Sequence, residues 1–580
     1  MEEAKRGISE DWLSFVLGMI IFLLSLGVFT NMDILGWGAN NKVWTELSKS
    51  VEPVSKGYQG VKGEITKIDG NKVTLKKADG KEEVITIADT AALAVGQKYE
   101  KTGTAPIVSV IYTYLFMMLL MGIGAGLMRL NLVKFVLGFT ITFWLSYACW
   151  VLGHFAYIAA LDPKAAKIDW SLRLSGEAGF IFALLAGLAV GNFFPKFAQT
   201  LKEAVKPELY VKTAIVIMGG ALGVKAAQQL NLASAVIFRG LCAIVEAYLI
   251  YWALVYFMAR KYFKFSREWA APLASGISIC GVSASIATGG AIRARPIIPI
   301  MVSSLVVIFA VVELIILPFM AREFLWQEPM VAGAWMGLAV KTDGAAVTSG
   351  AVTDALIRGK VLAETGVNYA DGWITMTATT VKVFIDIFIG VWAFVLAVIW
   401  CKYIECKEGQ SVGLGEVWNR FPKFVLGYAG TFILFLLLCI GPAGQIVDAE
   451  KITKPLEKEV ASLEKQLPTI TDADQKAALD AKLKEDKDKI KTVNDSIKAP
   501  KKFIANATLA NNEANSFRAL FFLLTFFTIG VVSNFKRLWE EGIGKLAAIY
   551  CIALFGFIIW IGLVISWIFF HGVKPPVITG

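Results

Sequence analysis

Long apolar runs recur from one end of this chain to the other. A transmembrane helix needs about 20 mostly apolar residues to cross the hydrocarbon core of a bilayer. About thirteen runs approach this length, near residues 12–29, 106–128, 133–160, 176–194, 209–228, 233–259, 269–292, 296–320, 331–356, 372–400, 421–440, 517–535 and 544–570. Hydrophobic residues make up 56% of the 580 residues and charged residues only 18%, which excludes a water-soluble enzyme. The sequence predicts a polytopic α-helical membrane protein with about thirteen transmembrane helices.

The Lys and Arg residues of the short loops predict the orientation, because such residues stay preferentially in the cytoplasm. With a cytoplasmic N-terminus, nineteen of them lie in cytoplasmic loops and eight in the opposite short loops. We therefore expect a multi-pass inner-membrane protein whose C-terminus and two polar inserts lie outside. Residues 1–30 are expected to form a retained signal anchor, and a cleaved signal peptide is the alternative. The net charge of +10 is explained by basic loops at anionic lipid headgroups, so no nucleic-acid partner is expected.

The first polar insert, residues 50–104, has the pattern of β-strands. Apolar and polar residues alternate over 63–68, 72–75 and 84–87, and Asp69-Gly70 and Asp79-Gly80 supply hairpin turns. This pattern predicts a small external β-barrel or β-sandwich module. The insert has few aromatic residues and no strong basic excess, so a spacer or a partner-docking module is expected.

The second polar insert, residues 442–515, alternates Lys with acidic residues. Its apolar residues recur at helical spacing on both sides of Pro468: Ile452, Leu456, Val460, Leu463 and Leu467 before it, and Ala477, Leu479, Leu483, Ile490, Val493 and Ile497 after it. We expect an external charged helical hairpin, either a solvated stalk or a contact with a second copy or another partner. Of the remaining chain, residues 106–165 add transmembrane helices, and residues 176–441 and 516–570 form the core.

Residue types that bind metals or perform nucleophilic chemistry are scarce. The seven cysteines lie in or beside the apolar runs, and the only histidines are His154 and His571. Neither a disulfide framework nor a metal-ligand cluster is evident, and no nucleophile–base pair or phosphate loop is found. We expect no cofactor, no metal and no enzymatic activity.

Two runs, 269–292 and 331–356, are too polar for lipid-facing helices and contain segments of small residues. The first segment, 275–290, has four Gly, four Ser and one Thr, and the second covers 337–350. Unwound backbone survives in a bilayer only where it lines protein or water, and a half-helix N-terminus offers N–H groups to an anion. The predicted substrate-binding residues are Gly276, Ser278, Cys280, Gly281, Ser283, Ser285, Lys341, Thr342 and Gly344. Plain helix packing by small residues is the alternative.

Ionisable residues inside the runs are candidates for coupling or gating, because they are costly to bury in a membrane. The main candidates are Asp343, Glu246, Glu313, Lys382 and Asp386. Glu246 and Glu313 either carry a proton or pair with a distant lysine, and Lys382 and Asp386 are spaced to neutralise each other on one helix face. Further candidates are Glu177 and, near the ends of runs, Lys225, Arg239 and Asp354.

Two Gly-interrupted polar segments in one bundle indicate a midplane transport site with discontinuous, crossing helices. A weak likeness between residues 218–230 and 527–538, in each of which Gly precedes a basic residue and a Leu, suggests inverted repeats.

At these residues the chain resembles the YeiH-type sulfate exporter family of bacterial inner-membrane proteins. The matching residues are 185–192, the region of Gly219, Gly276-x-Ser-Ile-Cys-Gly-x-Ser-Ala, 337–350, Thr380-Val-Lys382 and the closing pair of runs after Gly530. The resemblance covers 176–441 and 515–570, so the N-terminal part and the hairpin look like additions. It implies a secondary carrier related to the bile-acid/sodium symporter and sodium/proton antiporter folds, with sulfate or organosulfonates as assigned substrates.

The chain departs from the family pattern at two positions. Thr342 and Asp343 stand where many relatives have His followed by an acid, and Ile385 stands where a basic residue is common, with Asp386 next to it. These departures leave the substrate and the coupling ion open.

These observations predict a secondary transporter that moves a small anion by alternating access, coupled to a proton or sodium ion. Lys341 would supply positive charge to the anion, and Asp343, Glu246 or Glu313 would carry the coupling ion. The alternatives are an anion channel, or a membrane sensor whose external modules bind a ligand or partner.

Overall fold

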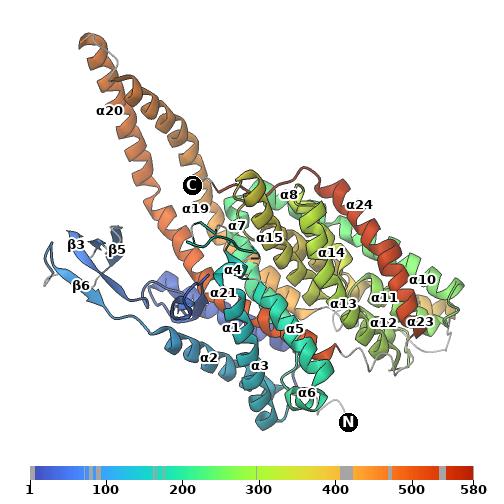
Figure 1. Ribbon diagram of the computed structural model, residues 1–580. Coiled ribbons are helices and arrows are strands. Elements are labelled where there is room, and N and C mark those ends of the chain that lie inside the picture. The colour runs from blue at the N-terminus through green and yellow to red at the C-terminus, as the bar shows by residue number, and fades with distance from the viewer. Residues whose placement is uncertain are drawn as a thin grey trace.

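The computed structural model describes residues 7–578 except 71, 77–81, 87–92, 161–162, 165, 173, 175, 177, 296, 405–421, 468–472 and 534–543. Helices dominate the fold (Figure 1), and the described part of each predicted run is mainly helical. Within these residues, nine helices are long and apolar enough to cross a membrane, or ten if the bent pair α5 and α6 is one span. The chain is therefore a polytopic α-helical protein.

The N-terminal half of the bundle consists of α1 (Glu10–Ser25), η2 (Leu26–Thr30), α2 (Pro106–Leu127), α3 (Leu132–Gly153), α4 (Ala156–Ala159), α5 (Ala178–Phe193), α6 (Pro195–Leu201), α7 (Pro207–Gln228), α8 (Leu230–Gly240), α9 (Cys242–Ile244), η4 (Val245–Tyr251) and α10 (Trp252–Lys261). Local sequence explains several of these boundaries. Ser9 caps α1 by accepting a hydrogen bond from the Trp12 amide. Prolines begin α2, α6 and α7, where their missing N–H costs nothing, and α5 and α6 meet at an angle of 116°.

The rest of the bundle consists of α11 (Arg267–Ser278), α12 (Gly281–Ala291), α13 (Ile297–Phe324), α14 (Pro329–Ala339), α15 (Asp343–Thr365), α16 (Trp373–Ile387), α17 (Ile389–Ile399), η5 (Trp400–Ile404), α19 (Lys423–Gln466), α20 (Ala473–Ser496), α21 (Lys498–Val532), α23 (Gly544–Ala553), η7 (Leu554–Ile558) and α24 (Ile559–Phe570). Gly366, with φ of +72°, ends α15 in the left-handed conformation.

Opposite ends of α7 mark the two faces of the bundle. Near its start, Lys212 Nζ lies 2.8 Å from Asp11 Oδ1 at the beginning of α1, and we name this face the N-side. Near its end, Lys225 Nζ lies 3.1 Å from Asp371 Oδ1, and we name this face the insert side. The cytoplasmic placement of the N-side remains a prediction.

The polar run 269–292 folds back on itself instead of crossing the bundle. A straight helix would hold Glu268 and Arg295 about 40 Å apart, at 1.5 Å per residue. Instead, the Arg295 amide lies 2.8 Å and its Nε 3.1 Å from Glu268 Oε1, and Thr288 Oγ1 donates to Ser275 Oγ at 2.7 Å. α11 and α12 are thus the two arms of a re-entrant hairpin, which we name hairpin A. Its break lies at residues 279–280.

The polar run 331–356 folds back in the same way. α16 runs along both of its arms: Gly333 and Gly337 of α14 pack on Ile374 and Ala378, and Gly350 of α15 packs on the same Ala378. α14 and α15 therefore form a second re-entrant hairpin, which we name hairpin B, with its break at residues 340–342. In Figure 1, hairpin A lies at the lower end of the bundle and hairpin B at the upper end.

Hairpins A and B correct the prediction that these two runs cross the membrane. Both were expected to be discontinuous spans, and the structure retains the breaks but returns each chain to the face from which it came. The predicted number of crossings falls by two, so the predicted orientation of the termini is unchanged. Some basic loop residues therefore lie on the other face than predicted: Arg293 and Arg295 lie on the N-side and Arg322 on the insert side. Next to Arg322, Glu323 forms an ion pair of 2.7 Å with Lys360.

The first polar insert forms an open antiparallel sheet in the order β5-β4-β3-β6, built from β3 (Val61–Asp69), β4 (Lys72–Lys76), β5 (Glu82–Thr86) and β6 (Lys98–Lys101). The predicted turn at Gly70 has φ of +60°, while Asp79-Gly80 lies outside the described residues. In the described strands the sheet closes into neither the predicted barrel nor the predicted sandwich, and its buried cluster is limited to Val61, Ile65, Val73 and Leu75. A separate pair, β1 (Ala39–Asn41) and β2 (Val51–Pro53), lies between this sheet and the bundle along the chain.

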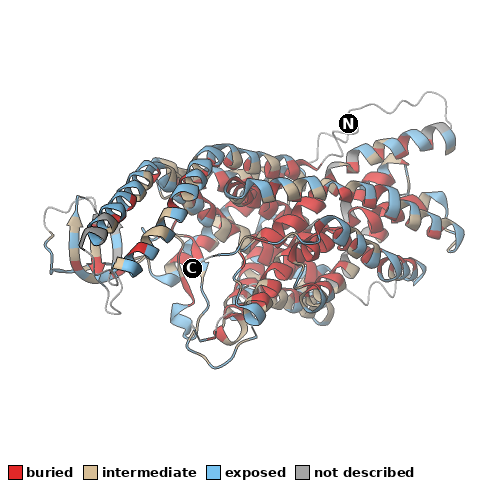
Figure 2. Ribbon diagram, turned by 90° about the horizontal axis from the view of Figure 1, so that it is seen from above, coloured by how far each residue is buried: buried red, intermediate tan, exposed pale blue. Residues whose placement is uncertain are grey.

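The second polar insert is helical, as its spacing predicts. α19 continues from the bundle into the first arm, and α20 and α21 return (Figure 1). Lys482–Glu459 and Lys487–Glu464 ion pairs, 2.5 and 2.8 Å long, link α19 and α20. Figure 2 shows that buried residues concentrate in the bundle, while the helical hairpin and the sheet are largely exposed. The segment before β1 packs on α21, where the Trp37 ring lies 6.0 Å from the Phe517 ring.

Candidate functional site

Hairpins A and B meet tip to tip. The Gly281 amide, at the start of α12, donates a 2.7 Å hydrogen bond to the carbonyl of Lys341, in the break of hairpin B. α13 passes both tips, since Gly281 packs on Val306 and Glu313 contacts Lys341. The discontinuous helices predicted from the small-residue segments therefore do meet, with their broken ends together in the interior.

The close approach at the tip of hairpin A requires glycine. A Cβ atom at Gly281 would lie 2.2 Å from Val306 Cγ1, and one at Gly276 would lie 2.6 Å from Val302 Cγ1. Ser285 Oγ donates to the Gly281 carbonyl at 2.6 Å within the same arm. The two glycines thus let α13 pack directly against hairpin A.

A buried lysine binds the C-terminal end of the first arm of each hairpin. Lys382 Nζ, from α16, donates to the Ile279 carbonyl at 2.6 Å, just after α11. Lys341 Nζ donates to the Leu338 carbonyl at the end of α14 and lies 4.3 Å from the centre of the Tyr251 ring. The C-terminus of a helix carries partial negative charge, so the two ammonium groups stabilise the two broken ends in the same way.

Glu313 joins the tip of hairpin B to α13 and α23. Its Oε2 accepts a 3.1 Å hydrogen bond from the Lys341 amide, and its Oε1 accepts a 3.0 Å bond from the Tyr550 hydroxyl. The sequence left two roles open for Glu313, a proton carrier or the buried partner of a distant lysine, and the structure places it beside Lys341.

Glu246 also interacts with Lys341 and lies in the π-helical segment η4. Its side chain is fully buried, and neither carboxylate oxygen has a hydrogen-bond partner within the described part of the chain. The nearby Tyr251 hydroxyl donates instead to the Ile558 carbonyl at 2.8 Å. Lys341 interacts electrostatically with Glu246, Lys382 and Glu313, so these four side chains form one charged cluster.

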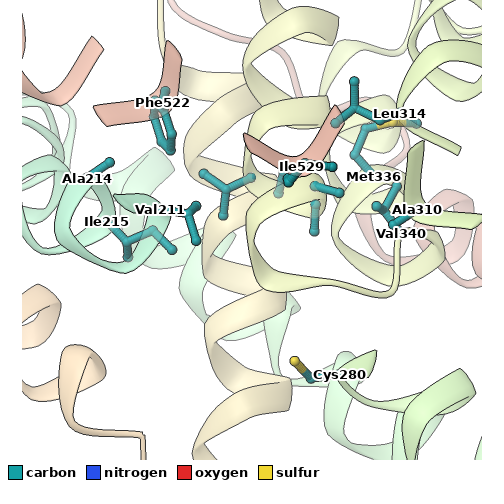
Figure 3. Close-up of a cluster of buried hydrophobic side chains, with 14 of the residues drawn as sticks. Val211, Ala214, Ile215, Cys280, Ala310, Leu314, Met336, Val340, Phe522 and Ile529 are labelled. Atoms are coloured by element: carbon teal, nitrogen blue, oxygen red, sulfur yellow. The ribbon is translucent and has the colours of Figure 1, made fainter. Parts of the chain in front are cut away.

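The remaining predicted substrate-binding residues lie around the same tips. Thr342 caps α15 by accepting a 3.2 Å hydrogen bond from the Ala345 amide, and Gly344 packs on Val211 of α7. Cys280 and Ser278 are buried at the break of hairpin A. Asp343 is the first residue of α15, but its side chain and that of Ser283 lie outside the described residues. Figure 3 shows Cys280 below the cluster of buried apolar side chains.

The apolar packing shown in Figure 3 brings distant helices to the tips. Val211 and Ile215 of α7, Phe522 and Ile529 of α21, and Leu314, Met336 and Val340 belong to one buried cluster. Lys341 and Lys382 are each only 1% exposed. The conformation described here therefore closes the tips to solvent.

Three candidates near the ends of runs have structural partners. Asp354 Oδ1 accepts from the Ile374 amide at 3.0 Å and Oδ2 from Arg358 Nε at 2.7 Å, so it caps α16. Lys225 pairs with Asp371, and Arg239 donates to the Phe569 carbonyl at 2.9 Å. Asp386 is buried on α16, and Glu177 lies outside the described residues.

Sequence reasoning missed Tyr251 and Tyr550. Both hydroxyls are buried in the bundle, and Tyr550 binds the Glu313 carboxylate directly. Tyrosine is common in apolar runs, where only its hydroxyl needs a partner, so neither residue stood out. A search for tyrosines on helices without a polar neighbour at helical spacing could have identified them.

Comparisons with known proteins agree with this architecture. A family described as conserved hypothetical protein 698 matches residues 148–456. A UPF0324 membrane protein of Nitrosomonas europaea is 35% identical over 98% of this chain and 97% of its own length. An uncharacterized protein of Archaeoglobus fulgidus is 43% identical over 35% of this chain and 88% of its own length. No solved structure matches.

The Nitrosomonas relative aligns over nearly the whole length of both chains, so its alignment includes the regions of both inserts. That the N-terminal part and the helical hairpin are additions to a family core stays a prediction. A second relative, a UPF0324 membrane protein of Nitratidesulfovibrio vulgaris, is 29% identical over 60% of this chain and 54% of its own length. The chain belongs to the UPF0324 family of membrane proteins, described as conserved hypothetical protein 698.

Proposed function

We propose that this protein is a secondary carrier, and not an enzyme, that moves a small anion such as sulfate or a sulfonate across the inner membrane by alternating access. The observation that carries this proposal is the contact between Gly281 and Lys341, where two broken helices from opposite faces meet. Broken helices at the middle of a bundle are the usual substrate and ion sites of secondary carriers.

The anion would bind at the tips, where α12 and α15 begin. Helix N-termini carry partial positive charge, and Lys341 and Lys382 add two ammonium groups. In the closed conformation the Glu313 carboxylate takes the hydrogen bond of the Lys341 amide. An incoming anion would compete with Glu313 for that amide and for the charge of Lys341.

This competition supplies a coupling mechanism. Protonation of Glu313 would remove its negative charge and release the Lys341 amide, so a proton on Glu313 and an anion at the tips would stabilise each other. Glu246, buried without a hydrogen-bond partner in the described residues, is the second candidate for the proton.

Lys341→Ala tests the anion site. In proteoliposomes, we expect the variant to lose saturable sulfate or sulfonate uptake and counterflow by at least tenfold, because the buried positive charge at the tips is gone. Lys212→Ala is the matched control, since Lys212 is also a buried lysine but binds Asp11 at the N-side. Normal counterflow in Lys341→Ala would exclude the assigned role, and a conductance without counterflow would indicate a channel.

Glu313→Gln tests the coupling. The amide mimics the protonated acid, so we expect anion exchange to persist while uptake driven by a pH gradient falls by at least tenfold. Glu246→Gln is the parallel variant at the second acid that interacts with Lys341. If only Glu246→Gln uncouples transport from the gradient, the proton carrier is Glu246; if neither does, a proton carried by these acids is excluded.

A further inference from the structure

A polar cavity of about 690 Å³ lies on the insert side, separate from the hairpin tips. It is bounded by α7, α15, α21 and the segment that contains β1. Small-molecule sites in proteins have volumes of about 300–1,000 Å³. The cavity is therefore large enough for an organic molecule, and an inorganic ion alone would fill only a small part of it.

The charged side chains on its wall have an excess of cations. Among the described lining residues, Lys225, Arg358 and Arg518 are basic, and Asp354 and Asp371 are acidic. Asp354 is already bound to Arg358 and to the first turn of α16. The charge that faces the cavity is therefore set mainly by Lys225, Arg518 and Asp371.

Amide side chains make up much of the remaining polar wall. They are Asn40, Asn41, Gln228, Asn511, Asn512 and Asn515. Asn41 Oδ1 accepts a 3.2 Å hydrogen bond from Tyr147, while its Nδ2 is buried without a partner in the described part of the chain. An amide both donates and accepts, so this wall suits a ligand that carries hydroxyl or amino groups beside its charge.

The Asp371 carboxylate pairs with a basic side chain of this cavity. Its Oδ1 lies 3.1 Å from Lys225 Nζ, and its side chain is 69% exposed. Partial desolvation by the surrounding protein raises the pKa of the Asp371 carboxyl, but Lys225, Arg358 and Arg518 together outweigh this effect and hold the pKa below its usual value. The three cations thus act jointly on a carboxylate that comes from a loop and points into solvent.

We propose that this cavity binds a small organic oxoanion, a carboxylate or a sulfonate, which takes the place of the Asp371 carboxylate beside Lys225. The Arg518 guanidinium, positioned over the Phe522 ring at 5.1 Å, binds the oxoanion head. Guanidinium groups suit this role because their planar N–H groups match two oxygens at once. The amide wall binds the polar tail.

The test is isothermal titration of the purified full-length protein with sodium isethionate at constant ionic strength. The Lys341→Ala background is used, so that the hairpin tips do not contribute. We expect Arg518→Gln to weaken binding about tenfold, equal to about 1.4 kcal/mol. Asp371→Asn should tighten it several-fold, because the resident competitor is removed, and a misfolded variant cannot produce such a gain.

Arg518→Lys is the conservative control, which retains the charge but not the planar pair of donors. Its affinity for isethionate should lie between that of the protein with Arg518 and that of Arg518→Gln. Equal affinities in all variants, or equal competition by chloride, would overturn the proposal. So would a loss of affinity in Asp371→Asn as large as in Arg518→Gln. If the unmodified protein binds isethionate and Lys341→Ala alone does not, the anion binds only at the tips, and the carrier proposal survives without this second site.

Discussion

At the scale of single residues, the buried acidic side chains of this protein have two different environments. Asp354 is saturated by the amides of α16 and by Arg358, and so holds two helices together. Glu246 has no hydrogen-bond partner in the described residues although it is fully buried. Burial of a carboxylate without a hydrogen bond is unfavourable, and the nearby charge of Lys341 offsets part of this cost at Glu246.

Asp354→Asn is expected to destabilise the protein by about 3–5 kcal/mol, because it removes the buried charge that pairs with Arg358 and weakens the cap of α16. Thermal unfolding in detergent would measure the loss. Glu323→Gln is the matched control, since its ion pair with Lys360 is half exposed on the glutamate side and should contribute no more than about 1 kcal/mol. Equal effects of the two variants would contradict the assigned role of Asp354.

At the scale of helices, small residues decide where the chain can turn back. The two polar runs form hairpins A and B, and their glycines let α13 and α16 pack against them at close range. Periodicity identified helices and breaks in both runs. Whether the chain continues or reverses at a break depends on contacts with α13 and α16, which no local pattern encodes.

Cysteine labelling distinguishes a re-entrant hairpin from a span. We expect Arg267→Cys and Arg293→Cys, at the two ends of hairpin A, to react with a membrane-impermeant maleimide from the same side. Glu328→Cys and Glu364→Cys, at the two ends of hairpin B, should react from the opposite side. Sealed vesicles of both orientations would be compared. Labelling of Arg267→Cys and Arg293→Cys from opposite sides would show that this run crosses the membrane.

At the scale of the whole molecule, the inserts divide into a part that belongs to the bundle and a part that projects from it. The middle of α21, near Asn511 and Arg518, lines the cavity. Farther out, Ile452 and Leu456 of α19 face Thr492 and Val493 of α20 along an open groove. The outer part of the helical hairpin is mostly exposed, and its surface ion pairs contribute little stability.

Replacement of residues 457–488 by a short Gly/Ser loop should therefore leave the melting temperature of the bundle unchanged. The rate of anion counterflow should stay within about twofold of that of the unmodified protein. The deletion removes exposed helix but retains Asn511 and Arg518. Flux and melting temperature in the same preparation would measure both. A loss of flux with normal melting would mean that the outer hairpin takes part in transport, by pairing with a second copy or by binding a partner.

The sequence by itself determined the class of the protein and most of its elements. Apolar runs of membrane-spanning length, strand alternation in the first insert and helical spacing in the second are local properties, and the described helices and strands follow them. The sequence also identified Lys341, Glu313, Glu246 and Lys382 as candidates, because a charge in an apolar run is costly wherever the run lies.

Only the tertiary structure decided how these parts combine. It brought Lys341, Glu313 and Tyr550 together from residues up to 237 positions apart, turned two expected spans into hairpins, and joined Lys225, Asp371 and Arg518 in one cavity. These arrangements rest on contacts between helices far apart in the chain. Local periodicity determines which face of a helix is apolar, whereas packing and burial of charge determine which helices meet.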